Sequence, residues 1–387
     1  MSILLTHGYL LAEDPVGREI KKPFPPLDLL WASAYLEGNG FENTVYDATF
    51  SSFNMLYNYI LRKKPTVLGL LVDTITRPTA IKLISEITKH RSLSGTYIII
   101  FGPAAEYHGE AFIKNGADMA IVGAIEQPLL EAFPLPNRKA INLNKYWTTW
   151  QNNHGYKPIS IVTMRENLKT NLSGHLSDQE NQRRKPEYVK EELAWLKQTY
   201  KSGHFWFVDK MFTTSKEWMQ DFLNHLEDQK LKISFECHAR IDQLNEEMLQ
   251  LLKACGCSRI WIGLEHGLKS IIEKAEWWGI SVGITIPIGN PEEQDEDITA
   301  KVEQLKQINP DQFSINLAYP SEGMDLSQDQ LNQIYRSQYY KHAVSWIINE
   351  MHYHFKQHGN LIPGLEAMNY KLSSFLARMN MVAYKNK

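Results

Sequence analysis

Cysteine is scarce in this chain. Only three of its 387 residues are Cys, and the first of them is Cys237. Three cysteines are too few for a disulfide framework in a chain of this length. Cys255 and Cys257 lie between a predicted helix and the next predicted strand, which is the end of a barrel opposite its cofactor-binding face. The chain therefore offers no spaced set of thiolates that could hold an iron–sulfur cluster.

Long apolar runs and an excess of one charge are also missing. No window reaches about 18 uninterrupted apolar residues, so no membrane span is expected. No basic region with a long apolar stretch opens the chain, so no signal peptide is expected. The formal net charge of −3 gives no reason to expect a nucleic-acid partner. These absences predict a cytoplasmic protein, and the basic run Arg183, Arg184 and Lys185 is interpreted as a solvated helix start.

Residues 1–135 alternate short apolar segments with amphipathic ones. Strands are predicted at 3–5, 43–47, 67–72, 97–101 and 119–122, and helices from 27 to 38, at 53–61, at 79–90 and at 109–114. The continuous apolar run 67–72 is typical of a buried parallel strand. The alternation predicts a Rossmann-like, doubly wound α/β sheet, which binds ligands beyond the C-terminal ends of its strands.

The loops at those strand ends form the candidate site of the first domain. They supply the predicted cofactor-binding residues Thr6, His7, Gly8, Asp73, Thr74, Gly102, Pro103, Gly123 and Glu126. Glycines there allow the backbone to approach a large flat ligand closely. His7 and His108 are isolated histidines, for which a role as surface loop residues is favoured over metal ligation.

The second half of the chain repeats the alternation. Residues 136–158 are predicted to be a linker, because they combine Pro, Asn and aromatic residues without clear periodicity. Trp147 and Trp150 are expected to pack this linker against one of the domains. Strands and helices alternate again over 159–325, which predicts a partial TIM-like (β/α) barrel. Residues 326–387 are predicted to form a helical tail.

The order of these pieces resembles the cobalamin-binding branch of the radical S-adenosylmethionine family. The resemblance covers about residues 1–345. It rests on a Pro-Pro-Leu helix start, Tyr46-Asp47-Ala48, Gly102-Pro103, Gly-x-x-Glu at 123–126, Gly-Leu-Glu-His-Gly at 263–267 and Tyr-Pro-Ser-Glu-Gly at 319–323. It implies a cobalamin-binding domain followed by a radical core. It also implies that Arg240 and Glu265 lie where the family contacts the nucleoside of S-adenosylmethionine.

The residues that define the family's chemistry are replaced. In the family, the loop after the first barrel strand carries Cys-x3-Cys-x2-Cys, whose thiolates hold a 4Fe-4S cluster. Asn167, Asn171 and Gly174 occupy those places here. Asparagine offers only a neutral amide oxygen and glycine has no side chain, so a 4Fe-4S cluster is not expected. Because no cysteine precedes Cys237, no shift of the alignment restores the three ligands.

A second departure concerns the wall of the barrel. The family places two helices and a loop where residues 268–279 supply only one short helix. This shortening disfavours binding of S-adenosylmethionine. Cobalamin stays the expected cofactor, and no histidine-ligated cobalt is expected because the motif Asp-x-His-x-x-Gly is absent.

Three functional hypotheses stay open. The first is a degenerate, cobalamin-binding pseudoenzyme that acts beside a partner protein, either an active radical homologue or a pathway enzyme. The second is a cluster-independent enzyme that uses cobalamin and S-adenosylmethionine for polar methyl transfer. The third is a reused barrel in which neither cofactor binds. In that case Asp209, His238, Glu265 and His266 would be catalytic acid–base residues at the barrel mouth.

Overall fold

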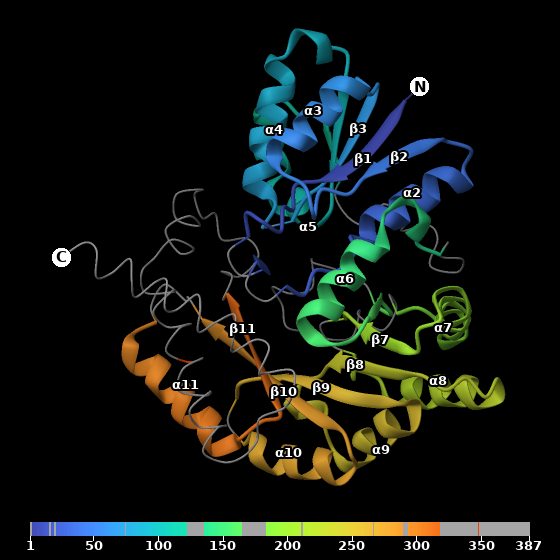
Figure 1. Cartoon of the computed structure of the whole chain (residues 1–387), viewed down its shortest axis with the longest axis vertical. Helices are drawn as coiled ribbons and strands as arrows, with labels where there is room; N and C mark the ends of the chain where they lie inside the picture. The colour runs from blue at the N-terminus through green and yellow to red at the C-terminus, as the bar shows by residue number, and fades with distance from the viewer. Residues whose placement is uncertain are drawn as a thin grey trace. The chain divides into compact units, whose positions relative to one another are not determined.

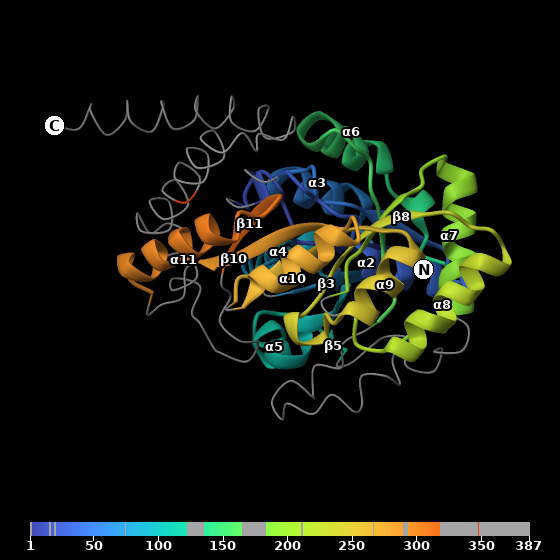
Figure 2. The ribbon, with the colours of Figure 1, turned by 90° about the horizontal axis from the view of Figure 1, so that it is seen from below.

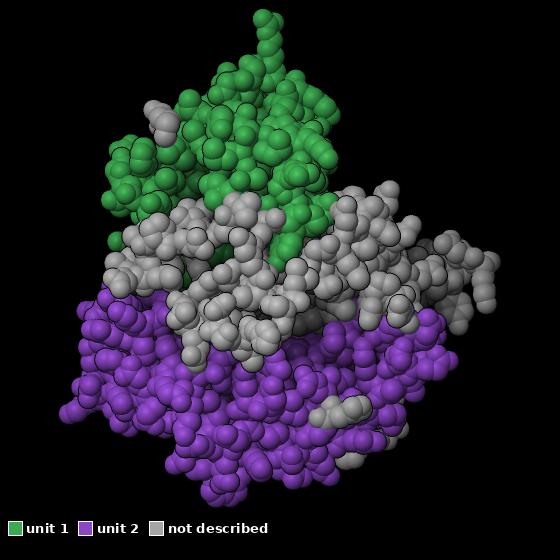
Figure 3. Space-filling model, turned by 180° about the vertical axis from the view of Figure 1, so that it is seen from behind, with its two compact units in different colours: residues 1–149, 166–182, 321–325 green, residues 150–165, 183–320, 326–387 purple. Residues whose placement is uncertain are grey.

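The structure is a computed structural model that describes residues 2–14, 17–18, 21–73, 75–121, 135–164, 183–209, 212–265, 267–288, 293–317 and 347. The described residues form two compact units, one reaching to Thr149 and the other starting at Trp150 (Figure 3). Within the described part of the chain, no helix is long and apolar enough to cross a membrane. The predicted tail 326–387 lies outside the described residues, except for Ile347.

The first unit, here unit 1, is built on a parallel sheet of five strands in the order β2-β1-β3-β4-β5. The strands are β1 (Ile3–His7), β2 (Asn43–Tyr46), β3 (Val67–Leu71), β4 (Tyr97–Phe101) and β5 (Met119–Ala120). The helices that connect them are α2 (Leu27–Gly38), α3 (Phe53–Lys63), α4 (Arg77–Lys89) and α5 (Pro103–Lys114). The predicted parallel α/β architecture of this half of the chain is therefore confirmed.

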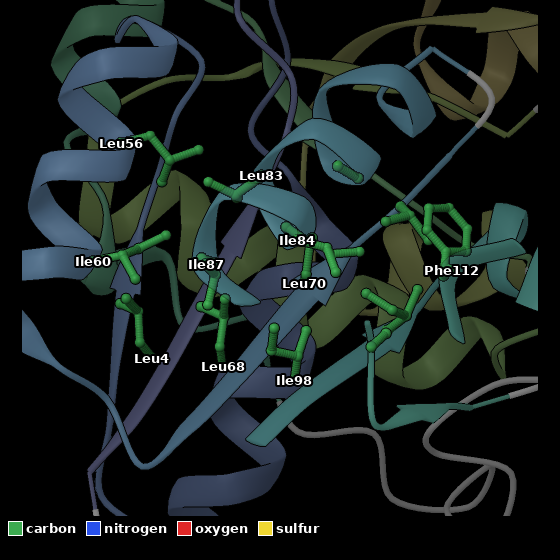
Figure 4. Packing of buried hydrophobic residues seen from close by; sticks show 14 of the residues in the cluster. Leu4, Leu56, Ile60, Leu68, Leu70, Leu83, Ile84, Ile87, Ile98 and Phe112 are labelled. Carbon is green, nitrogen blue, oxygen red and sulfur yellow. The ribbon is translucent and has the colours of Figure 1, made fainter. Parts of the chain in front are cut away.

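Helices cover both faces of this sheet, with α3 and α4 on one side and α2 on the other (Figure 1). Leu68 and Leu70 of β3 point into the core that α3, α4 and α5 share (Figure 4). Val67 and Leu71 of the same strand pack on the side of α2, because side chains alternate along a strand. Each fully buried leucine of this core contributes roughly 1.5–3 kcal/mol of hydrophobic stabilisation.

The second unit, here unit 2, is built on a parallel sheet of six strands in sequential order, β11-β10-β9-β8-β7-β6. The strands are β6 (Ile159–Ile161), β7 (His204–Phe207), β8 (Ser234–His238), β9 (Cys257–Gly263), β10 (Ser281–Ile288) and β11 (Gln312–Leu317). The helices are α7 (Pro186–Tyr200), α8 (Lys216–Asp228), α9 (Glu246–Cys255), α10 (Leu268–Trp277) and α11 (Asp295–Ile308). Figure 2 shows α9, α10 and α11 along the same face of this sheet.

The two faces of the six-stranded sheet differ in chemistry. The alternate residues Ile284 and Ile286 of β10 are fully buried, as are Phe205 and Phe207 of β7. On the opposite face the strands carry His204, Trp206, Glu236, Arg259 and Trp261, which contact one another. One face therefore forms an apolar core, while the other holds a polar and aromatic network.

Two segments differ from the predictions. The predicted linker contains a regular helix, α6 (Leu143–His154), whose polar composition hides its periodicity. Trp150 is buried and packs against Trp206, with ring centroids 5.6 Å apart, as expected for a tryptophan that anchors this segment. Helix α5 begins at Pro103, well before the predicted start at 109, because proline fits the first turn of a helix.

Candidate functional site

The C-terminal ends of β1, β3 and β4 are adjacent in the sheet of unit 1. The residues that end or follow these strands are Thr6, His7, Gly8, Asp73, Gly102 and Pro103, which we call the unit 1 edge. Thr74, Gly123 and Glu126 were predicted to join them, and these three lie outside the described residues. The topology thus brings the described members of the predicted site together.

Gly102 is required by the backbone rather than by a ligand. Its φ is +104°, and a Cβ atom there would lie 2.7 Å from the carbonyl oxygen of Val72. Any other residue would be strained and would clash with the neighbouring strand end. Gly102 directly precedes Pro103 in the first turn of α5. Close packing of the chain therefore explains this glycine without the ligand approach that the sequence suggested.

Asp73 folds the turn that leads into α4. Its backbone amide donates to Oγ1 of Thr76 at 2.8 Å, and its Oδ1 accepts the Thr76 amide at 2.7 Å. Burial raises the pKa of the Asp73 carboxyl, although both Thr76 contacts act in the opposite direction. These two hydrogen bonds fix the conformation of the turn at the unit 1 edge.

His7 lies at the centre of a buried hydrogen-bonded network. Its Nε2 lies 3.1 Å from Oδ1 of Asp47 and accepts the Ala48 amide at 3.2 Å. Its Nδ1 accepts the amide of Tyr9 at 3.1 Å, and Oδ2 of Asp47 accepts the Tyr146 hydroxyl at 2.9 Å. The prediction of a surface loop histidine is wrong, because the His7 side chain is only 4% exposed. With both ring nitrogens occupied, His7 has none left for a metal ion.

Charge and burial shift the pKa values of Asp47 and Tyr146 in this network. Burial acts to raise the pKa of Asp47, but the hydrogen bond and charge of His7 and the bonds from Thr49 lower it overall. Burial, with the neighbouring Asp47 carboxylate, raises the pKa of Tyr146 well above its usual value. Tyr146 therefore stays a hydroxyl donor. One sequence signal pointed to this network, Asp47 at the end of a predicted strand. None pointed to Tyr146, which lies far along the chain.

In unit 2, the carboxylate of Asp209 binds the backbone that follows β6. Asp209 follows β7 and is buried. Its Oδ1 accepts the amides of Thr163 and Met164, each at 2.8 Å, and its Oδ2 accepts the Thr163 hydroxyl at 2.9 Å. Burial raises the pKa of Asp209, while the bonds to Met164 and Thr163 oppose the rise. In this geometry Asp209 holds the backbone after β6.

The basic residues before α7 are also structural. Nη1 of Arg184 donates to Oε2 of Glu192 at 2.6 Å and to the carbonyl oxygen of Val162 at 2.9 Å. The Arg184 and Glu192 side chains are 5% and 1% exposed. The Arg183 guanidinium lies over the ring of Trp218, 3.9 Å from its centroid. The prediction of a solvated helix start is therefore wrong for Arg184, whose buried partner a local sequence pattern does not reveal, whereas Lys185 is exposed.

Arg240 and Glu265 remain exposed at the C-terminal edge of the six-stranded sheet. Nε and Nη2 of Arg240 donate to the two carboxylate oxygens of Asp242, at 3.0 and 2.7 Å. Asp242 raises the pKa of Arg240, with a smaller contribution from the charge of Glu265. The structure thus places Arg240 and Glu265 on one edge. His238 ends β8, and His266 lies outside the described residues.

Sequence reasoning missed Glu236, which is buried in the middle of β8. Its carboxylate lies 3.0 Å from Nε2 of His204 and 3.1 Å from Nη1 of Arg259, and it accepts Nε1–H of Trp261 at 2.8 Å. Burial acts to raise the pKa of Glu236, but His204, Arg259 and Trp261 lower it to about 2. A charged residue inside an otherwise apolar strand was the signal that could have identified it.

Two of the three cysteines, Cys237 and Cys255, do not offer thiolates. All three cysteines are buried. Burial raises the pKa of Cys237 well above its usual value and that of Cys255 to about 12, so both are neutral thiols at pH 7. Among the residues that the structure describes, no group of three or more His, Cys, Asp or Glu side chains could hold a metal ion. The substituted positions Asn167, Asn171 and Gly174 lie outside that part of the chain.

Several solved structures of cobalamin-dependent enzymes share this architecture. TsrM of Kitasatospora setae, a radical S-adenosylmethionine methyltransferase solved with cobalamin and a 4Fe-4S cluster, matches at a TM-score of 0.55. The match covers 85% of this chain and 78% of TsrM at 15% identity. OxsB, a cobalamin-dependent S-adenosylmethionine radical enzyme solved with aqua-cobalamin and S-adenosylmethionine, matches at 0.56, over 88% of this chain and 56% of OxsB at 14% identity. The chain has the fold of cobalamin-dependent radical S-adenosylmethionine enzymes.

A curated protein is also similar in sequence. An uncharacterized methyltransferase of Pyrococcus horikoshii is 27% identical over an alignment of 152 residues, and the match covers 35% of this chain and 33% of the relative. The chain thus spans about a third of that relative's length. No protein-family model matches the sequence. The resemblance suggested by the order of motifs is confirmed in the fold of both units.

Proposed function

We propose that this chain binds cobalamin, holds no 4Fe-4S cluster and does not cleave S-adenosylmethionine reductively. The observation that carries the proposal is a match along both units to a cluster-containing, cobalamin-bound structure, in a chain whose first cysteine is Cys237. In this proposal the six-stranded sheet is a partial (β/α) barrel, and residues 326–387 are its helical tail.

The residues present do not fit an iron–sulfur cluster. Such a cluster is held by cysteine thiolates, and the segment 165–182 contains no cysteine. The cysteines of unit 2 are buried, and burial keeps Cys237 and Cys255 in the neutral thiol form. No step of a reaction is therefore assigned to a cluster.

The unit 1 edge fits a large cofactor by its topology. In the strand order β2-β1-β3-β4-β5 the chain reverses direction along the sheet between β1 and β3, and parallel sheets bind ligands at such a switch point. Thr6, Gly8 and the turn closed by Asp73 and Thr76 flank that point. Bound cobalamin would supply a cobalt centre for methyl chemistry. This chain's residues would bind and orient it, without a ligand from His7.

We assign the chain a non-catalytic role beside a partner protein, an active radical homologue or an enzyme of the same pathway, in the cytoplasm. The contrast between retained and lost features supports this role. The residues at both ends of the segment 165–182 are anchored, through Asp209 and through the pair of Arg184 and Glu192. The ligands inside that segment are replaced. Selection for the fold without selection for cluster chemistry accounts for this combination.

One observation favours a second candidate, cluster-independent methyl transfer from S-adenosylmethionine. Arg240 and Glu265 are exposed on the same edge of unit 2, where a ligand could reach them. The third hypothesis, acid–base chemistry at the barrel mouth, has less support because Asp209 is buried and its oxygens are bonded to backbone.

A reconstitution experiment tests the proposal. The full chain would be purified without oxygen, loaded with aquacobalamin, and incubated with S-adenosylmethionine and dithionite. We expect a bound-cobalamin spectrum and no 5′-deoxyadenosine. Formation of S-adenosylhomocysteine without 5′-deoxyadenosine would favour the second candidate, and 5′-deoxyadenosine above the background of a protein-free control would refute the main proposal. The Arg240→Ala variant should bind as much cobalamin as the wild type, because Arg240 belongs to unit 2.

A further inference from the structure

We propose that Trp150 of α6 is an internal occupant of unit 2, which takes the position of a planar ligand on one face of the six-stranded sheet. That face, here the inner face, is the one that carries His204, Trp206, Glu236, Arg259 and Trp261. The proposal deepens the proposed function and rests on it, because a filled inner face would be a second reason, besides the missing cluster, why this chain does not cleave S-adenosylmethionine. Its structural part rests on unit 2 alone.

The inner face needs a cover that the strand–helix repeat does not supply. A closed eight-stranded barrel fills its interior with side chains from strands on every side. The six strands described here form an open sheet, with β6 and β11 at its edges. The opposite face is the apolar core, so another element has to cover the inner face. Trp150 comes from α6, which precedes the first strand of the unit and lies outside its strand–helix repeat.

Two tryptophans on the strands form an aromatic floor. Trp206 of β7 and Trp261 of β9 are stacked, with ring centroids 5.7 Å apart and 29° between the ring planes. Trp261 also lies against β10, because a Cβ atom on Gly283 would be 2.5 Å from its Cε3. A glycine inside a strand marks such a close approach. Nε1–H of Trp261 donates to Glu236 at 2.8 Å, which holds the ring in this orientation.

Trp150 covers this floor. Its ring centroid lies 5.6 Å from that of Trp206, with 55° between the planes. Tyr156, which follows α6, lies 5.4 Å from the Trp150 ring and 4.9 Å from the ring of His204, so the chain continues along the same face. Trp150, Trp206 and Trp261 are only 1%, 5% and 2% exposed. A ligand therefore cannot reach the floor while Trp150 is in place.

The chemistry of the floor indicates which ligand Trp150 replaces. Tryptophan rings bind planar heteroaromatic groups by stacking, largely independent of the substituents on those groups. The indole of Trp150 is itself such a group, supplied by the chain. Its removal would leave a space bounded by the stacked pair of Trp206 and Trp261, and an apolar cavity that keeps its shape binds a ligand of the size of the lost side chain. Indole is therefore the probe that fits.

Indole binding to the full-length Trp150→Ala variant, measured by isothermal titration calorimetry, tests the proposal. We expect indole to bind this variant at least roughly tenfold more tightly than it binds the wild type. Trp147→Ala is the matched control, because Trp147 lies on the same helix and is only half-buried. This control should bind indole as weakly as the wild type. A folded Trp150→Ala variant that binds indole no better than the wild type or the control would overturn the proposal.

The same probe decides the outcome if Trp150→Ala does not fold by itself. Indole added during refolding should then restore the circular dichroism spectrum of the wild type, because it replaces the lost ring on the floor. Failure of indole to restore the spectrum would overturn the proposal.

The assays of the proposed function are run on the same proteins, so the two claims fail separately. Indole binding by Trp150→Ala, with 5′-deoxyadenosine formed by the wild type, would uphold Trp150 as an internal occupant and refute the proposed function. The opposite pattern, cobalamin bound without 5′-deoxyadenosine and no indole binding by Trp150→Ala, would refute only the role of Trp150.

Discussion

The two sheets use the polar residues at their strand ends in different ways. In unit 1, His7 ends β1 and Asp47 follows β2. The two side chains bind each other, and Asp47 also accepts the Tyr146 hydroxyl, so the edge is shaped by contacts between side chains. In unit 2, Asp209 binds backbone amides, and the exposed residues Arg240 and Glu265 remain at the edge. The difference shows that a charged residue at a strand end has one of two roles. A buried residue stabilises the fold through its hydrogen bonds, whereas an exposed residue is accessible to a ligand.

The physical reason is the cost of burying a charge. A carboxylate taken out of water must be paired or accept several hydrogen bonds, or it would be neutral. Asp47 and Asp209 both meet that condition through neighbours in their own units. A residue whose oxygens are filled in this way positions the backbone. Strand-end location in the sequence therefore identifies an edge, but not which of its residues touch a ligand.

The largest effect is expected from Glu192→Ala in unit 2. The change leaves the buried Arg184 guanidinium without its carboxylate, which should cost roughly 3–5 kcal/mol of unfolding free energy. Urea denaturation followed by hydrogen exchange would show the loss in unit 2 peptides and not in unit 1. Glu303→Ala is a matched control, because Glu303 pairs with Lys306 at the surface and its loss should change little. A loss below about 1 kcal/mol for Glu192→Ala would contradict the structural role.

A pH-dependent loss of about 3 kcal/mol is expected from Glu236→Gln. The pKa of Glu236 is about 2 in the folded unit and about 4.3 in an unfolded chain. Its contribution is therefore complete above about pH 4.3 and is lost as the pH falls from there toward 2. Chemical denaturation of wild type and variant at several pH values should show their difference shrinking on acidification. A difference that does not vary with pH would show that His204 and Arg259 do not stabilise the charge.

Asp209→Asn should destabilise unit 2 by about 2 kcal/mol. The amide group of asparagine would place a donor against Thr163 or Met164, where the carboxylate now accepts. Thermal unfolding of the two proteins measures the change. Asp242→Asn is the control, because Asp242 pairs with Arg240 at an exposed site and should change stability little. Equal effects of the two substitutions would mean that Asp209 has no special anchoring role.

The smallest effect is expected from Tyr146→Phe in unit 1, about 1 kcal/mol. The ring stays packed, and only the hydroxyl bonds to Asp47 and Thr49 are lost. Peptide-resolved exchange in urea should place the change in unit 1. A loss of stability in unit 2 instead would contradict the assignment of Tyr146 to the network of unit 1.

Much of the fold followed from local patterns. The apolar run at 67–72 predicted the buried strand β3, and the strand at 97–101 was predicted to the residue. The single short helix predicted after Gly267 is α10. Apolar periodicity is a local property, so a single sequence shows it. Helix α6 was not predicted, because its composition is dominated by Asn, Thr and aromatic residues.

The site was less predictable, because partners distant in sequence decide the role of each residue. Asp209 and Arg240 both follow strands, yet one is bonded to the backbone of a segment far back in the chain and the other to its neighbour Asp242. His7 was predicted to lie at the surface, because no pattern near it in the sequence indicates that it pairs with Asp47 or that Asp47 also binds Tyr146. Which groups are buried is fixed by the packing of the whole unit, not by local pattern.

The central claim is that this fold is kept with cobalamin and without a cluster, and elemental analysis tests it most directly. The full chain would be produced with added cobalamin and iron, purified without oxygen, and analysed for cobalt, iron and sulfide. The account predicts stoichiometric cobalt with only background iron and sulfide. About four irons per chain, with matching sulfide, would contradict it, because that is the content of a cubane cluster.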